Sequence, residues 1–229
     1  MENILPQLNE SYEVKEEYRR LRTNIQFYGK KVKVIVFTSC HPGEGKSEIS
    51  LQVARSLCQL EKKVLYIDAD LRRPVLEEQL TLEERPEGLS QYLADISSLE
   101  SIILHTETAG LDIVTAGVIP PNPTELLAGK KFKQMVIELK QAYDYVIIDS
   151  PPCEDVVDAL VIASVCDGAV LVVQDKHTAK QTLIHVKEEL DKTGTIMLGA
   201  VLNKVDFKKN TKYKKYKKYY EKKYTQETA

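Results

Sequence analysis

The sequence has no tryptophan, few cysteines and no long apolar run. Its four cysteines are widely spaced and form no C-x-x-C pair, so we expect free thiols, with no disulfide and no structural metal. No stretch approaches the length that spans a bilayer, and the N-terminus lacks the basic flank and apolar core of a secretion signal. These absences predict a cytoplasmic protein, and the composition is that of an ordinary globular domain.

Charge is unevenly distributed along the chain. The formal net charge is -2, but nine lysines and one glutamate between residues 208 and 224 give that stretch +8 and leave -10 for the rest. Tyrosine is the only hydrophobic residue type in this stretch, and so little apolar surface does not offset the entropy of ordering the chain. We therefore predict a folded domain over residues 1–206 and a flexible Lys/Tyr-rich tail over 207–229.

A glycine-rich turn follows the first apolar strand and ends in Gly-Lys-Ser. Its backbone N–H groups, at the start of a helix, suit the binding of phosphate oxygens. Lys46 would reach the terminal phosphates, and the Ser47 hydroxyl would bind Mg²⁺. Cys40 occupies the place of the usual first glycine. The predicted nucleotide-binding residues here are Pro42, Gly43, Glu44, Gly45, Lys46, Ser47 and Glu48.

Two more apolar strands end in carboxylates. Residues 63–68 lead to Asp68 and Asp70, and residues 145–149 lead to Asp149. Ligands bind at the carboxyl ends of strands in parallel α/β sheets, and carboxylate oxygens suit Mg²⁺. Together with the glycine-rich turn, these acids predict a magnesium-nucleotide site.

The remaining segments alternate between helical and strand patterns. We expect helices over about 124–142, 155–165 and 179–192, strands over 111–117, 168–173 and 196–202, and small helices and loops over 81–110. Repeated βα units with apolar strands imply a parallel sheet covered on both faces. The predicted fold is therefore α/β, a doubly wound, mostly parallel sheet of the P-loop NTPase type.

The first helix, expected over about residues 11–28, has one apolar stripe and one charged line. Glu16, Arg19 and Arg22 lie along that line, and Glu16 can pair with Arg19. Spacing alone favours a solvated charged face over a subunit contact, because surface ion pairs are common and weak.

Two features near the C-terminus have more than one interpretation. Asn203 to Asp206 match N-K-x-D, by which GTPases recognise guanine, but Asn203 could equally contact adenine. The tail could be a basic arm for nucleic acid or an anionic membrane. It could also be a phosphorylation cluster, because five phosphotyrosines would add about -7.5 to -10, enough to cancel its positive charge.

The combined motifs closely resemble those of the bacterial tyrosine kinases (BY-kinases) of capsular and exopolysaccharide synthesis. The resemblance covers nearly the whole chain and is carried by Pro-Gly-Glu-Gly-Lys-Ser, the Asp68–Pro74 segment, Asp149-Ser-Pro-Pro and the terminal tyrosines. Glu16 to Arg22 also match the family's E-x-x-R-x-x-R oligomerisation motif, which reverses the preference for a merely solvated face. Pro120 to Leu127 is similar to the family's proline-rich segment.

The resemblance implies an ATP- and Mg²⁺-dependent protein-tyrosine kinase. Lys46 would bind the phosphates, Ser47, Asp68 and Asp149 would hold Mg²⁺, and Asp68 or Asp70 would be the base. The implied phosphoacceptors, modified in trans by a neighbouring copy, are Tyr213, Tyr216, Tyr219, Tyr220 and Tyr224.

The resemblance also implies partners. They are other copies in a ring, such as an octamer, that contact one another through Glu16, Arg19 and Arg22 and dissociate on phosphorylation. A membrane adaptor, as in the Gram-positive form of the family, would activate the kinase at the inner face of the membrane. No nucleic-acid partner is implied.

Two other classes compete with this interpretation. A partitioning or division-site ATPase shares the expected fold, but such proteins carry a second lysine early in the loop, where this chain has His41. A GTP-binding switch protein with a membrane- or nucleic-acid-binding tail would use Asn203 to Asp206. A comparison of ATP and GTP affinity separates the second class from a kinase.

Overall fold

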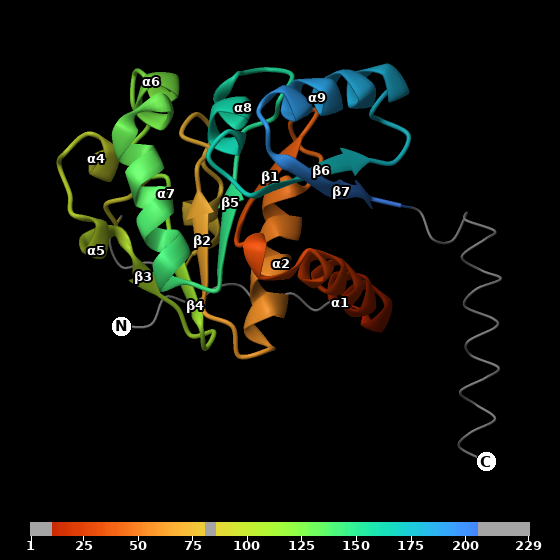
Figure 1. The fold of residues 1–229 in the computed structure, drawn as a ribbon, viewed down its shortest axis with the longest axis horizontal. Coiled ribbons are helices and arrows are strands. Elements are labelled where there is room, and N and C mark those ends of the chain that lie inside the picture. The colour runs from red at the N-terminus through yellow and green to blue at the C-terminus, as the bar shows by residue number, and fades with distance from the viewer. Residues whose placement is uncertain (1–10, 81–85, 206–229) are drawn as a thin grey trace, which may run out of the picture.

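A computed structural model describes residues 11–80 and 86–205, so Asp206 and the predicted acceptor tyrosines lie outside the described residues. The sheet has seven strands in the order β3-β4-β2-β5-β1-β6-β7 (Figure 1). Only the β3–β4 pairing among them is antiparallel. The strands are β1 (Val34–Ser39), β2 (Val64–Asp68), β3 (Leu104–His105), β4 (Leu111–Val114), β5 (Tyr145–Asp149), β6 (Gly168–Gln174) and β7 (Ile196–Asn203).

Helices cover both faces of the sheet (Figure 1). The N-terminal half supplies α1 (Tyr12–Phe27), the 3-10 turn η1 (Gly29–Lys31), α2 (Lys46–Cys58), α3 (Leu76–Gln79), α4 (Leu89–Leu93) and α5 (Leu99–Ile102). The C-terminal half supplies α6 (Pro123–Ala128), α7 (Lys130–Ala142), α8 (Asp158–Ala163) and α9 (Lys180–Lys192). The described part of the chain contains no helix long and apolar enough to cross a membrane.

The strands separate two hydrophobic cores. On one face α2 contributes Val53 and Leu57, and α1 contributes Ile25. On the other face α7 contributes Phe132 and Met135. Side chains alternate between the two faces along each strand, so the fully buried central strands have apolar residues at nearly every position. The doubly wound prediction is confirmed.

The first helix packs as its stripe predicts. Ile25 is buried, and Tyr18 and Leu21 pack against the same core. The expected Glu16–Arg19 ion pair forms between two partly exposed side chains.

Three details of the sequence prediction are wrong. The helix expected over 124–142 is two helices, because Gly129 adopts an extended conformation with ψ 153° and separates α6 from α7. Glycine is a poor helix residue, so the break costs little there. The helix expected over 155–165 is shorter and is limited to α8. The sheet was expected to be covered on both faces, but its edge strand β7 is partly exposed. All four cysteines are free, as expected.

Candidate functional site

Three neighbouring strands bring the predicted site residues together. In the sheet β5 lies between β2 and β1, and Asp68 at the end of β2 is the register partner of Asp149 at the end of β5. Partners on adjacent parallel strands are about 4.8 Å apart and point to the same face. The sheet order reverses beside β1, which is where ligands bind in open α/β sheets.

The loop between β1 and α2 has the conformation that its glycines predict. Gly43 and Gly45 have φ of 77° and 90°, in the left-handed region that disfavours other residues. A Cβ atom on Gly45 would lie 2.2 Å from Nδ2 of Asn203, so this position also requires glycine for space. Cys40, which replaces the usual glycine, is fully buried in the core.

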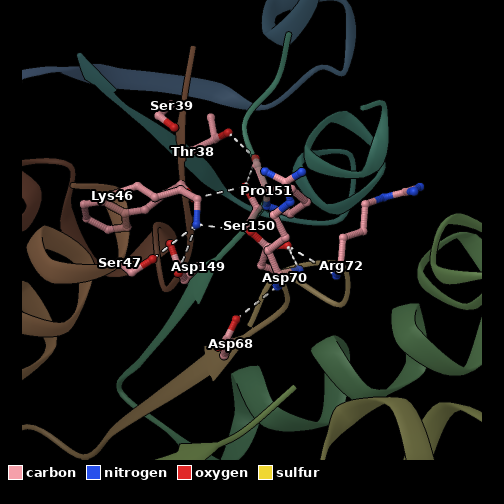
Figure 2. Close-up of polar contacts among 12 residues, drawn as sticks. Thr38, Ser39, Lys46, Ser47, Asp68, Asp70, Arg72, Asp149, Ser150 and Pro151 are labelled. Atoms are coloured by element: carbon pink, nitrogen blue, oxygen red, sulfur yellow. Dashed lines mark hydrogen bonds and ion pairs between the residues drawn. The ribbon is translucent and has the colours of Figure 1, made fainter. Parts of the chain in front are cut away.

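Lys46 lies among carboxylates from the two neighbouring strand ends. Its Nζ is 3.4 Å from Oδ2 of Asp70, 3.4 Å from Oδ2 of Asp149 and 3.2 Å from Oγ of Ser47 (Figure 2). Burial favours the neutral amine, but the surrounding aspartates outweigh it and raise the pKa of Lys46. The lysine is therefore a fixed positive charge at the mouth of the loop.

Asp68 and Asp149 are fully buried acids. Burial, with the Asp149 charge next in importance, raises the pKa of Asp68 to about 7. Burial also raises the pKa of Asp149, although Lys46 and a hydrogen bond with Ser47 oppose this effect. The Oδ1 atom of Asp149 is buried without a hydrogen-bond partner. An orphaned carboxylate oxygen beside a serine hydroxyl fits a hard cation such as Mg²⁺.

A cavity of about 690 Å³ opens above these residues. Six of the predicted loop residues line it, together with Asp70, whereas Asp68 and Asp149 lie beneath its surface. The cavity is lined by Pro42, Gly43, Gly45, Lys46, Ser47, Glu48, Asp70, Arg72, Arg73, Val75, Pro151, Pro152, Asp155, Val156 and Lys204.

Two of the predicted nucleotide ligands have other partners. The Glu44 side chain is fully buried and does not line the cavity, so its carboxylate does not face the nucleotide space. Asn203 donates from Nδ2 to the backbone carbonyl of Glu44 at 2.9 Å. Arg22, a predicted subunit contact, donates to the Ser56 carbonyl at 2.6 Å and so holds α1 against α2.

The sequence interpretation missed two contacts around the site. Arg72 makes a two-pronged ion pair with buried Asp158, through Nε at 2.7 Å and Nη2 at 3.2 Å, and also donates to Thr124. Lys204 donates from Nζ to the Gly43 carbonyl at 2.7 Å. Arg72 lies within a recognised motif, but nothing local in the sequence indicates Asp158 as its partner.

The buried Asp68 predicts a specific pH dependence of stability in metal-free protein. Its folded pKa of about 7 exceeds the unfolded value of 3.8, so the folded state binds the proton more tightly. The Asp68 contribution therefore lowers the free energy of unfolding as pH rises from about 4 to 7. In urea titrations with EDTA, Asp68→Asn should become progressively more stable relative to wild type over that range. A difference that stays constant with pH would contradict the assignment.

Comparison with known proteins gives close matches. A family model described as an AAA domain matches residues 32–198. Tyrosine-protein kinase CpsD of Streptococcus agalactiae is 40% identical over 206 residues, which cover 90% of each chain. Tyrosine-protein kinase YwqD of Bacillus subtilis is 40% identical over 200 residues, 86% of this chain and 84% of that one. The crystal structure of the chimerical protein CapA2B2 superposes with a TM-score of 0.78 at 37% identity, covering 83% and 84% of the two chains.

The rival ATPase class is a more distant match. The septum site-determining protein MinD of Pyrococcus horikoshii has a TM-score of 0.67 but only 24% identity, over 76% of this chain and 71% of that one. This likeness extends to the fold alone. Identity near 40% over nine-tenths of the sequence, with the phosphate loop and strand-end aspartates in place, shows that the chain belongs to the family of bacterial tyrosine-protein kinases.

Proposed function

We propose that the chain is an ATP-dependent protein-tyrosine kinase that phosphorylates the C-terminal tyrosines of a neighbouring copy and so regulates capsular or exopolysaccharide synthesis and export. The observation that carries the proposal is the meeting of Lys46, Asp70 and Asp149 at one cavity, in a chain whose relatives are named tyrosine kinases. The tyrosine cluster, Tyr213 to Tyr224, supplies acceptors within the same sequence.

The site suits in-line transfer of the γ-phosphoryl group. The loop N–H groups and Lys46 bind the ATP phosphates, while Ser47, Asp68 and Asp149 supply the oxygens that hold Mg²⁺. When bound, Mg²⁺ neutralises charge on the β- and γ-phosphates. The tyrosine oxygen attacks the γ-phosphorus, the bond from that phosphorus to the ADP oxygen breaks, and the phenolic proton passes to a carboxylate.

Asp70 fits the role of proton acceptor better than Asp68. Asp70 lines the cavity, and its Oδ2 points toward Lys46. Both oxygens of Asp68 instead accept backbone N–H groups, from Asp70 at 3.1 Å and from Leu76 at 3.3 Å, below the cavity surface. A base must reach the acceptor hydroxyl, so the accessible carboxylate is the better candidate.

The charged side of α1 is available for contact with another copy. The Arg19 and Glu16 side chains are 48% and 41% exposed, whereas Arg22 orients α1 from within the chain. In the proposed ring, such as an octamer, Glu16, Arg19 and Arg22 contact the next subunit. Phosphorylation cancels or slightly reverses the positive charge of the tails and so drives dissociation. A membrane adaptor recruits the kinase to the inner face of the membrane and activates it, and no nucleic acid takes part.

The test is phosphorylation of the purified chain with ATP, Mg²⁺ and the cytoplasmic fragment of its adaptor. Mass spectrometry should find phosphate on Tyr213, Tyr216, Tyr219, Tyr220 or Tyr224, and a variant with phenylalanine at all five should incorporate none there. Size-exclusion chromatography should show a smaller species after phosphorylation. An unmodified tail under these conditions would refute the kinase assignment, and an unchanged size would refute the dissociating ring.

A further inference from the structure

We propose that Glu44 and Thr178 form a brace that holds the phosphate loop in its nucleotide-binding shape, and that both are positioning residues for Mg-ATP. Glu44 lies within the loop, and Thr178 lies in the turn that follows β6. The brace rests on nucleotide binding at the loop, which is part of the proposed function, but not on phosphoryl transfer.

The Glu44 carboxylate receives hydrogen bonds from both segments. Oε2 accepts the backbone N–H of His41 at 3.0 Å, within the loop itself. Oε1 accepts the backbone N–H of Gln174 at 3.3 Å and the Thr178 hydroxyl in a short bond. One side chain therefore joins the start of the phosphate loop to the end of β6.

A second contact joins the same two segments. The rings of His41 and His177 meet edge to face, with 5.8 Å between their centroids. The loop backbone is also held from β7, through the bond from Asn203 to the Glu44 carbonyl. The loop is thus anchored by residues at the ends of β6 and β7 together.

The burial of Glu44 explains why the brace favours one conformation of the loop. Glu44 has no exposed surface, and burying a carboxylate is costly unless hydrogen bonds satisfy it. The three donors reach the Glu44 carboxylate only when the loop and the turn after β6 keep their observed relative positions. Any loop movement that opened the phosphate cradle would separate Glu44 from at least one donor, so the buried carboxylate opposes such movement.

The consequence for binding is pre-organisation. A loop that orders only when nucleotide arrives loses backbone entropy at that moment, which weakens affinity. A loop held in advance presents its N–H groups without that loss. The brace should therefore act on the affinity for Mg-ATP and the KM for ATP, and much less on kcat at saturating ATP.

The experiment compares Thr178→Val with Thr178→Ser. Valine has nearly the shape of threonine but no hydroxyl, so Thr178→Val should weaken binding of Mg-ATP about tenfold in calorimetry. Serine keeps the hydroxyl and should restore most of the affinity. Glu44→Gln should weaken binding at least as much, and the double variant Glu44→Gln, Thr178→Val should be no weaker than Glu44→Gln alone, since the two side chains act as one unit.

Thr193→Val, at the other end of α9, is the matched control and should bind Mg-ATP like wild type. Its hydroxyl bonds locally, to the Leu190 carbonyl and to Thr195. The brace would be overturned if Thr178→Val bound Mg-ATP as tightly as wild type. It would also be overturned if Thr178→Val and Thr178→Ser lost equal affinity for Mg-ATP. Wild-type protein that does not bind Mg-ATP would instead overturn the proposed function, so the two failures are distinguishable. Both Thr178 variants keep Glu44, so the comparison holds even where Glu44→Gln does not fold.

Discussion

Replacing Lys46 with methionine should reduce tail phosphorylation by about 10³-fold or more. The lysine is the cation nearest to Asp70 and Asp149 in the described site, with Nζ 3.4 Å from an oxygen of each. Methionine keeps similar length and apolar contacts but removes the charge that would face the transferring phosphoryl group. The loss should appear in kcat as well as in KM, because charge on the phosphoryl oxygens must be stabilised in the transition state. Phosphate incorporation measured by mass spectrometry or with radiolabelled ATP checks this.

Lys133→Met is the matched control for Lys46→Met. Lys133 is exposed on α7, so its variant should phosphorylate the tail at the wild-type rate. Lys46→Met also leaves the buried aspartates without their cation, and its melting temperature should be recorded at the assay pH. Incorporation within threefold of wild type in a folded Lys46→Met protein would show that Lys46 is not the phosphate-binding lysine.

Arg72→Ala should produce one of the largest losses of stability for a partly exposed side chain. Its partner Asp158 has no exposed surface and receives both prongs of the guanidinium. Removing one member of such a pair leaves a buried charge uncompensated, which costs about 3 kcal/mol. For a domain of this size the melting temperature should fall by roughly 6 to 12 °C. Kinase activity should also fall, because the pair holds the segment after β2, which carries Asp70, against α8.

Arg73→Ala is the control for Arg72→Ala, at the next position. The Arg73 side chain is exposed, and its backbone N–H rather than its guanidinium bonds to Asp70. Its melting temperature should change little, since most surface substitutions fall within about 0.5 kcal/mol. Arg72→Lys should recover only part of the stability, because an ammonium group does not make the two-pronged contact. Equal losses at positions 72 and 73 in thermal unfolding would show that Asp158 does not depend on Arg72.

Most of the fold followed from local patterns. The buried strands β1, β2 and β5 are nearly continuous apolar runs, and the phosphate loop and strand-end acids are short motifs that can be recognised without the rest of the chain. The prediction failed where the apolar pattern was continuous but the helix was interrupted. The apolar spacing runs from α6 into α7, and only the extended Gly129 separates the two helices.

The site was predicted less completely than the fold. Lys46, Ser47, Asp68, Asp70 and Asp149 meet as expected, because each lies at or just beyond the end of a strand or in the first turn of α2. The parallel sheet brings those ends to one edge. The hydrogen-bond partners of the Glu44 side chain were not predicted. Its place in the motif suggests a nucleotide ligand, whereas its side chain is buried and does not line the cavity.

The sequence by itself determined the succession of helices and strands along the chain, the phosphate loop, the strand-end carboxylates and the family resemblance. Each of these depends on residues that are close together in the chain. Only the tertiary structure decided the partners of Glu44, Arg72 and Lys204. Thr178 lies 134 positions from Glu44, Asp158 lies 86 from Arg72, and Gly43 lies 161 from Lys204. Hydrogen bonds between residues so far apart in the chain form only once the strands have paired, so no local sequence pattern predicts them.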